Sequence, residues 1–188
     1  MAPLRGRADV LRGVATGRGD DGADAAGAAV TTLAPPPAGV AAATVAGAAC
    51  SATWEQVLAR DYSDAAYRRV SQLNVDAYVA QHAGRTGRRE VQTVALCLMT
   101  LCLVVEEGVD PAEGPRRHAR MVGARLPLHW LEPPDLRGPL TVADVLAADD
   151  PDAHEHVVRR WAEQVWQAWS PHHTTVRRWN ALTAGPGG

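Results

Sequence analysis

The sequence contains no lysine, no isoleucine and no phenylalanine, so all 19 of its basic residues are arginines. This bias is typical of GC-rich coding, which favours Ala, Gly, Arg, Pro and Val codons, and it makes the arginine content weak evidence for anion binding. The net charge is only −2. A nearly neutral chain lacks the basic face that nucleic-acid binding needs, so we expect no nucleic-acid partner.

Cysteine is also scarce, with only Cys50, Cys97 and Cys102 in the chain. Cys97 and Cys102 lie in a predicted helix at positions roughly 140° apart around its axis, so they cannot pair with each other. There is no CxxC pair and no even set of cysteines for a disulfide framework. This pattern favours a reducing, cytoplasmic setting, with both helical thiols as inert core residues.

No hydrophobic run is long enough to cross a bilayer. The most apolar segment, residues 91–105, is interrupted by Gln92, Thr93 and Thr100, whereas about 20 apolar residues are needed for a span. Residues 41–49, before Cys50, lack the strongly apolar core of a signal peptide and lie far from the start. We therefore expect residues 91–105 to form a buried core helix and the protein to have no membrane partner.

Residues 1–49 are rich in alanine and glycine, contain three consecutive prolines at 35–37, and have no aromatic residue. Such a segment cannot bury enough surface to offset its ordering entropy, so it is expected to be a disordered tail or an over-extended start. The length of the chain allows one sizeable core. We expect a helical domain over residues 50–183 and a flexible C-terminus over 184–188.

The remaining chain shows helical periodicity throughout and no convincing period-two alternation. Residues 124–140 are rich in proline and glycine and predict an irregular loop. The fold class is therefore all-α, a single compact domain of five to seven helices around the segment 91–105. A late helix opening at Asp150-Pro151 carries a clear apolar stripe, and helix starts are marked by capping residues. The stripe is Val158, Trp161, Val165 and Trp169, and the caps are Thr53, Ser63 or Asp64, Thr141, Asp150 and Ser170.

One candidate site lies in residues 74–82, Asn-Val-Asp-Ala-Tyr-Val-Ala-Gln-His, at the end of a predicted helix. Tyr78 and His82 are four residues apart and share a helix face. Asp76 and His82 are roughly 120° apart, so a regular helix cannot direct both into one site. His82 in the last turn either bonds free carbonyl groups there or serves as a ligand or an acid–base group.

A second candidate is the stretch Ser170-Pro171-His172-His173. With Val176 and Trp179, His172 falls on the apolar stripe of the predicted last helix, whereas His173 falls outside it. A first-turn histidine tends to stay neutral and could bind a metal or accept a proton. The alternative is a core histidine bonded to a backbone carbonyl.

Other motifs in the sequence give weaker evidence for a functional site. His154 and His156 are about 200° apart on a helix, so residues 152–156 predict a solvated first turn rather than a metal motif. Trp161 and Trp169 lie on the core stripe and predict packing rather than a ligand cage, while Trp130 and Trp166 are less explained. The sequence has no GxSxG motif, no P-loop and no dinucleotide fingerprint in a helix-forming context.

Between about Cys50 and Trp179 the chain carries five distinctive segments: NVDAYVAQHAG, LCLVVEEGVDP, HWLEPP, TVADVL and WAEQVWQAWSPHHTTVRRW. These segments resemble an uncharacterised actinobacterial family, the domain of unknown function 5946. Many of its members begin with a Cys-Pro-x-Cys-Gly element that looks like half a metal site, and carry a histidine near the position of Cys97. This chain departs at both points, so a metal site of that kind would be incomplete here. The family implies no activity.

Two functional hypotheses follow. The first is a cytoplasmic protein with a pocket between helices formed by Tyr78, His82 and His172 and supported by Asp76 and Gln81. His82 and His172 would bind a divalent metal, zinc or iron, and catalysis is left open. The second is a non-catalytic protein-interaction or regulatory module whose histidines are structural. The first requires the two histidines to approach each other, and the second requires each to bond separately to the backbone.

Overall fold

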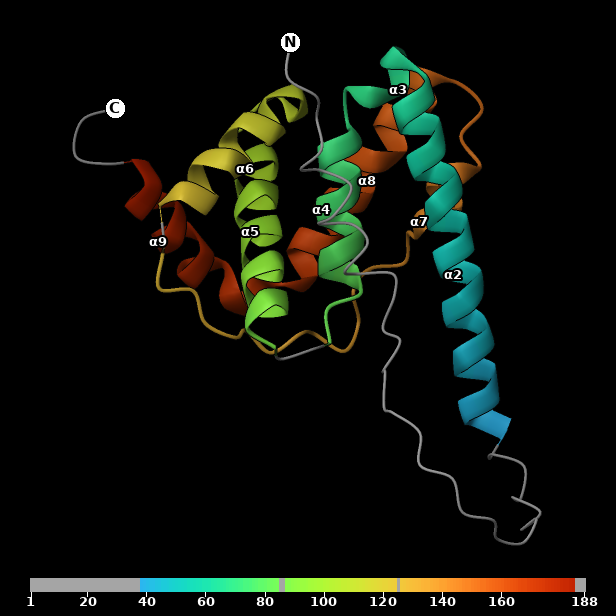
Figure 1. Ribbon diagram of the computed structural model, residues 1–188, viewed down its shortest axis with the longest axis horizontal. Helices are drawn as coiled ribbons and strands as arrows, with labels where there is room; N and C mark the ends of the chain where they lie inside the picture. Colours follow the sequence, from blue (N-terminus) through green and yellow to red (C-terminus); the bar gives the residue numbers. More distant parts are fainter. Residues whose placement is uncertain (1–37, 85–86, 125, 185–188) are drawn as a thin grey trace, which may run out of the picture. The chain divides into compact units, whose positions relative to one another are not determined.

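The computed structural model describes residues 38–84, 87–124 and 126–184 (Figure 1). Eight α-helices and two short 3-10 helices form these parts of the chain, which contain no strand, so the all-α prediction is confirmed. The helix count is one above the expected upper bound of seven. The elements are α2 (Ala38–Ser63), α3 (Ala65–Arg68), α4 (Ser71–Gln81), α5 (Arg88–Val105), η1 (Pro111–Glu113), α6 (Gly114–Gly123), α7 (Val142–Leu146), α8 (Pro151–Ala168), η2 (Ser170–His172) and α9 (His173–Ala184).

The chain divides into two compact units at the junction of Ser51 and Ala52. Helix α2 begins at Ala38, inside the segment expected to be a disordered tail, and residues 1–37 of that segment lie outside the described residues. The expected flexible C-terminus at 184–188 lies almost wholly outside them as well. The second unit begins at Ala52 and contains the last part of α2 and all the helices from α3 to α9.

Helix α5 is the centre of this unit. Every side chain from Val94 to Val104 is buried, which confirms the prediction of a core helix. Helices α4, α6, α8 and α9 pack against α5 and surround it in Figure 1. Burying a large aliphatic side chain contributes about 1.5–3 kcal/mol, so this helix is the main source of hydrophobic stability. None of the helices described is both long and apolar enough to cross a membrane.

The stripe predicted on α8 is also confirmed, because Val158, Trp161, Val165 and Trp169 are all fully buried. Helix α8 packs against α4, α5 and α7, so these side chains close the core on the side of α4 and α5. Residues 126–141 contain no helix, as the proline-rich composition predicts.

Side-chain caps fix several helix starts. The Asp150 carboxylate accepts a hydrogen bond from the Ala153 amide at 2.8 Å, and Pro151 follows as the first helical residue. Thr141 and Asp144 form a reciprocal capping box at the start of α7. Asp64, one of the two expected residues, caps α3. A helix N-cap satisfies an amide that has no partner within the helix.

Replacing Asp150 with alanine removes this cap and should lower the free energy of unfolding by about 1 kcal/mol. Urea denaturation followed by circular dichroism measures the change. The matched control is Asp149→Ala, the same substitution one residue earlier at an exposed position. Equal stability of the two variants would show that the cap contributes nothing.

Candidate functional site

The structure brings Tyr78 and His82 together, as their spacing predicts. The Tyr78 ring is stacked between Trp54 and His82, with ring centroids 4.2 Å and 4.1 Å away. His82 Nδ1 donates a hydrogen bond to the Tyr78 carbonyl at 2.8 Å. Burial lowers the pKa of His82, the bond to the Tyr78 carbonyl opposes that shift, and the nearby Arg137 charge lowers the pKa further. The His82 imidazole is therefore neutral, and it caps the C-terminal end of α4.

Gln81 links three elements instead of facing this stack. Its amide nitrogen donates to the carbonyls of Arg137 at 3.2 Å and Leu140 at 2.8 Å. Its amide oxygen accepts the indole N–H of Trp161 at 3.2 Å. Gln81 therefore joins the end of α4 to the loop before α7 and to α8, which is a structural role.

Asp76 lies in the core between α4 and α5, away from His82. Its side chain is fully buried, accepts a hydrogen bond from Gln72 at 3.0 Å, and lies beside the Cys97 thiol. Burial raises the pKa of Asp76 from 3.8 to about 8, although the hydrogen bonds from Gln72 and Cys97 oppose the shift. Burial and the neighbouring Asp76 also raise the pKa of Cys97, so that thiol stays protonated and inert.

The two histidines near the C-terminus have exchanged the expected roles. His173 is buried, stacks on Trp166 at 3.8 Å between centroids, and donates to the Trp166 carbonyl at 2.9 Å. His172 is half-buried and donates to the Glu132 carbonyl at 2.8 Å. The prediction that His172 points inward was wrong because residues 170–172 form a 3-10 turn, which changes the rotation before α9 begins.

His82 and His172 thus bond separately to two different backbone carbonyls. Nowhere in the described residues do three or more histidine, cysteine, aspartate or glutamate side chains gather as a group that could hold a metal ion. This arrangement is the one that the hypothesis of structural histidines requires.

A buried polar network that the sequence analysis did not identify includes Asn74 of α4. Asp61, Asn74 and His154 are all fully buried. Asn74 donates to Asp61 at 2.8 Å, and His154 Nε2 lies 3.2 Å from the other oxygen of Asp61. Arg60 donates to His154 Nδ1 at 2.7 Å, and because an arginine cannot accept, the His154 ring carries its proton on Nε2.

Arg60 extends this network, which we call the Arg60–His154 network, to the end of α7. Its guanidinium donates to the carbonyls of Val145 at 2.6 Å, Leu146 at 3.1 Å and Ala148 at 2.9 Å. The network therefore joins α2, α4, α7 and α8. The expectation of a solvated first turn at His154 was wrong. A signal existed in the sequence, because His154 lies four residues before Val158 and continues its stripe.

A second polar cluster ties the end of α5 to α8 and α9. Glu106 accepts two hydrogen bonds from Arg177, at 2.7 and 2.8 Å, and one from the Trp166 indole at 2.9 Å. The Arg177 hydrogen bonds hold the pKa of Glu106 at about 2, far below its ordinary value. This contact explains the role of Trp166. Its indole N–H binds a carboxylate, and the rest of its ring packs in the core.

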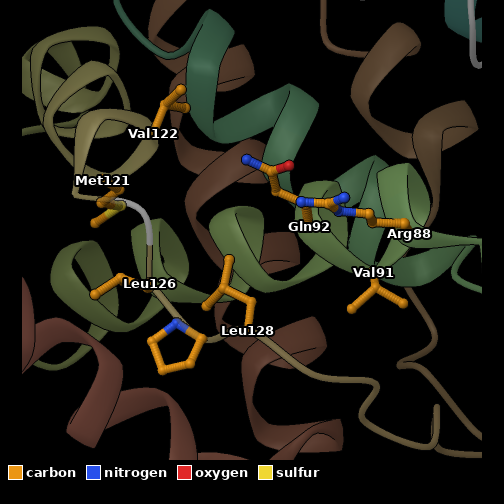
Figure 2. Close-up of a pocket in the computed structure, with 8 residues that line it drawn as sticks. Arg88, Val91, Gln92, Met121, Val122, Leu126 and Leu128 are labelled. Atoms are coloured by element: carbon orange, nitrogen blue, oxygen red, sulfur yellow. The ribbon is translucent and has the colours of Figure 1, made fainter.

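A cleft large enough for a small molecule lies between α5, α6 and the chain that follows α6 (Figure 2). Its volume is about 750 Å³. Six of the eight lining residues have apolar side chains, and the polar side chains among them are one guanidinium and one amide. The lining residues are Arg88, Val91, Gln92, Met121, Val122, Leu126, Pro127 and Leu128.

Residues 19–170 match the model of a family of unknown function, DUF5946. The chain belongs to this family. The match covers α3 to α8 completely and begins within the alanine-rich segment before Cys50. No curated protein and no solved structure matches the chain. The family has no assigned function, so the function has to be argued from the site.

Replacing His154 with alanine leaves Asp61, Asn74 and Arg60 without a shared partner in the core. Removing one member of a buried charged network costs about 3–5 kcal/mol, so we expect a loss of stability of that order. The matched control is His156→Ala on the same helix, at an exposed position, which should change little. Urea denaturation of both variants decides the point, and similar midpoints would contradict the structural role of His154.

The buried Asp76 should give the stability of the fold an unusual pH dependence. Its folded-state pKa of about 8 is above the ordinary 3.8, so its protonated form stabilises the fold fully below pH 3.8. That stability is lost as the pH rises through about 8, by up to about 1.4 kcal/mol per pH unit. Asp76→Asn cannot ionise, so its stability relative to the wild type should improve steadily from pH 5 to about pH 8 and level off above that pH.

Thermal or urea unfolding at several pH values measures this difference. Glu163→Gln is the control, because it removes an exposed carboxylate from α8 and should run parallel to the wild type. Parallel profiles for Asp76→Asn would show that Asp76 ionises normally in the folded state.

Proposed function

We propose that this protein is a non-catalytic binding module, that the cleft between α5 and α6 is its ligand site, and that its histidines are structural. One observation carries the proposal: the cleft volume of about 750 Å³ lies within the 300–1,000 Å³ typical of small-molecule sites. A lining with six apolar side chains and two polar ones is also typical of such sites.

The chemistry of the lining favours binding over turnover. General acid–base and nucleophilic catalysis use imidazole, carboxylate, thiol, hydroxyl or amine groups. The eight lining side chains include none of these, since the polar ones are Arg88 and Gln92. A guanidinium and a carboxamide both donate hydrogen bonds, so these two groups can orient a ligand without acting as a general acid or base.

The histidines support the same proposal. The rings of His82, His172 and His173 each donate to a backbone carbonyl, and His154 is held between Arg60 and Asp61. A zinc or iron site at His82 and His172 stays a separate prediction, which metal analysis of protein purified without a polyhistidine tag would test. A cytoplasmic location, inferred from the scarce cysteines, likewise stays a prediction, as does a protein partner.

The neutral fluorescent probe N-phenyl-1-naphthylamine tests the cleft without involving charge. We expect saturable binding to the wild type and a loss of at least tenfold in affinity for Val122→Glu. That substitution places a carboxylate in the apolar wall at a residue already 46% exposed, so folding should survive.

The matched control is Leu136→Glu, the same kind of change at a residue that is 85% exposed and is not among the lining residues. It should bind the probe as the wild type does, with circular dichroism confirming the fold of both variants. Absence of saturable binding to the wild type, or unchanged binding to Val122→Glu, would refute the proposed site.

A further inference from the structure

We infer that the ligand of the cleft is an amphipathic monocarboxylate, an apolar chain with one carboxylate end that pairs with Arg88. This inference rests on the proposed function and specifies its ligand class. The sequence alone did not point to it, because an arginine-rich composition is weak evidence for an anion site. Arg88 differs from the other described arginines because it lines the cleft.

Both polar side chains of the cleft lie on α5, where the apolar Val91 lines the cleft beside them. Arg88 and Gln92 are four residues apart on α5 and share one face of the helix, where Figure 2 shows both on the same wall. The opposite wall and the floor come from α6 and the following chain, and their lining side chains are all apolar: Met121, Val122, Leu126, Pro127 and Leu128. A ligand with one polar end and an apolar body fits this division.

Arg88 has no competing partner. No hydrogen bond or ion pair engages its guanidinium anywhere in the described structure, whereas Arg60 and Arg177 are bound by carbonyls and a carboxylate. The nearest acid in sequence, Glu90, has its carboxylate folded over Gly87, the residue before α5. The guanidinium of Arg88 therefore remains available to a ligand.

The position of Arg88 adds to this argument. It is the first residue of α5, where the helix dipole disfavours a cation and favours an anion. A carboxylate bound to Arg88 would relieve that unfavourable placement. The flat guanidinium also matches a carboxylate in a two-point hydrogen bond, and the Gln92 amide can donate one more.

The charge of the ligand follows from the same groups. The described lining residues include one cation and no acid, so one negative charge is balanced there and an ammonium group would be repelled. A dianionic headgroup would keep one charge unbalanced beside apolar walls. A single carboxylate on an apolar chain is the simplest match.

Isothermal titration with decanoate and decanol, both below the concentration at which decanoate forms micelles, tests the inference. The two ligands share a chain and differ in the charged end. We expect the wild type to bind decanoate roughly three- to tenfold more tightly than decanol, the effect of a partly exposed ion pair. Arg88→Gln should remove this preference by weakening decanoate alone, and added salt should reduce it.

Arg89→Gln is the matched control, because Arg89 is the next residue, is exposed, and is not among the lining residues. It should keep the preference for decanoate. Equal weakening by both substitutions would overturn direct pairing with Arg88 in favour of general charge attraction.

The remaining outcomes separate this inference from the proposed function. If the wild type binds decanol and decanoate equally, or binds the naphthylamine probe but not decanoate, the carboxylate inference fails and the cleft stands. If neither ligand nor the probe binds, the proposed function fails together with the inference.

Discussion

The burial of α5 is the constraint on which the rest of this unit depends. Eleven consecutive side chains, from Val94 to Val104, are buried, so the helix must be covered on every side along this length. Helices α4, α6, α8 and α9 provide that cover. The first turn of α5 is different, because Arg88 and Arg89 are exposed there. The cleft lies at this end, where the complete enclosure of the helix stops.

Polar side chains determine how the covering helices are joined. The Arg60–His154 network connects α2, α4, α7 and α8, and Glu106 connects the end of α5 to α8 and α9 through Trp166 and Arg177. Asp61 and His154 are fully buried, and buried polar groups are costly unless each has a partner, so the Arg60–His154 network specifies one arrangement of helices more strictly than apolar packing does. In a chain without lysine, arginine makes these links, and its planar guanidinium can reach several carbonyls at once.

Local periodicity was enough to predict the core but not the polar contacts. The stripe of α8 and the apolar run of α5 repeat within a few residues, and the structure confirms both. The partners of Arg60 are 85 to 94 residues away in sequence, a distance at which no spacing rule operates. His154 carried a local signal that its polar neighbours obscured. The exchange of His172 and His173 arose from one 3-10 turn, which a regular helical wheel cannot anticipate.

The polar groups described so far have partners within the fold, whereas the cleft contains a polar group that is available to a ligand. Acidic residues outnumber basic ones, 21 to 19, so a shortage of carboxylates does not explain why Arg88 has no ion-pair partner in the described residues. Its placement does, because the side chains around it in the cleft are apolar apart from Gln92. Water is partly excluded beside apolar walls, and an ion pair is stronger there than on an open surface. Recognition by this protein is therefore expected where an unsatisfied charge meets unfilled apolar surface, and not at the histidines, whose hydrogen bonds already serve the fold.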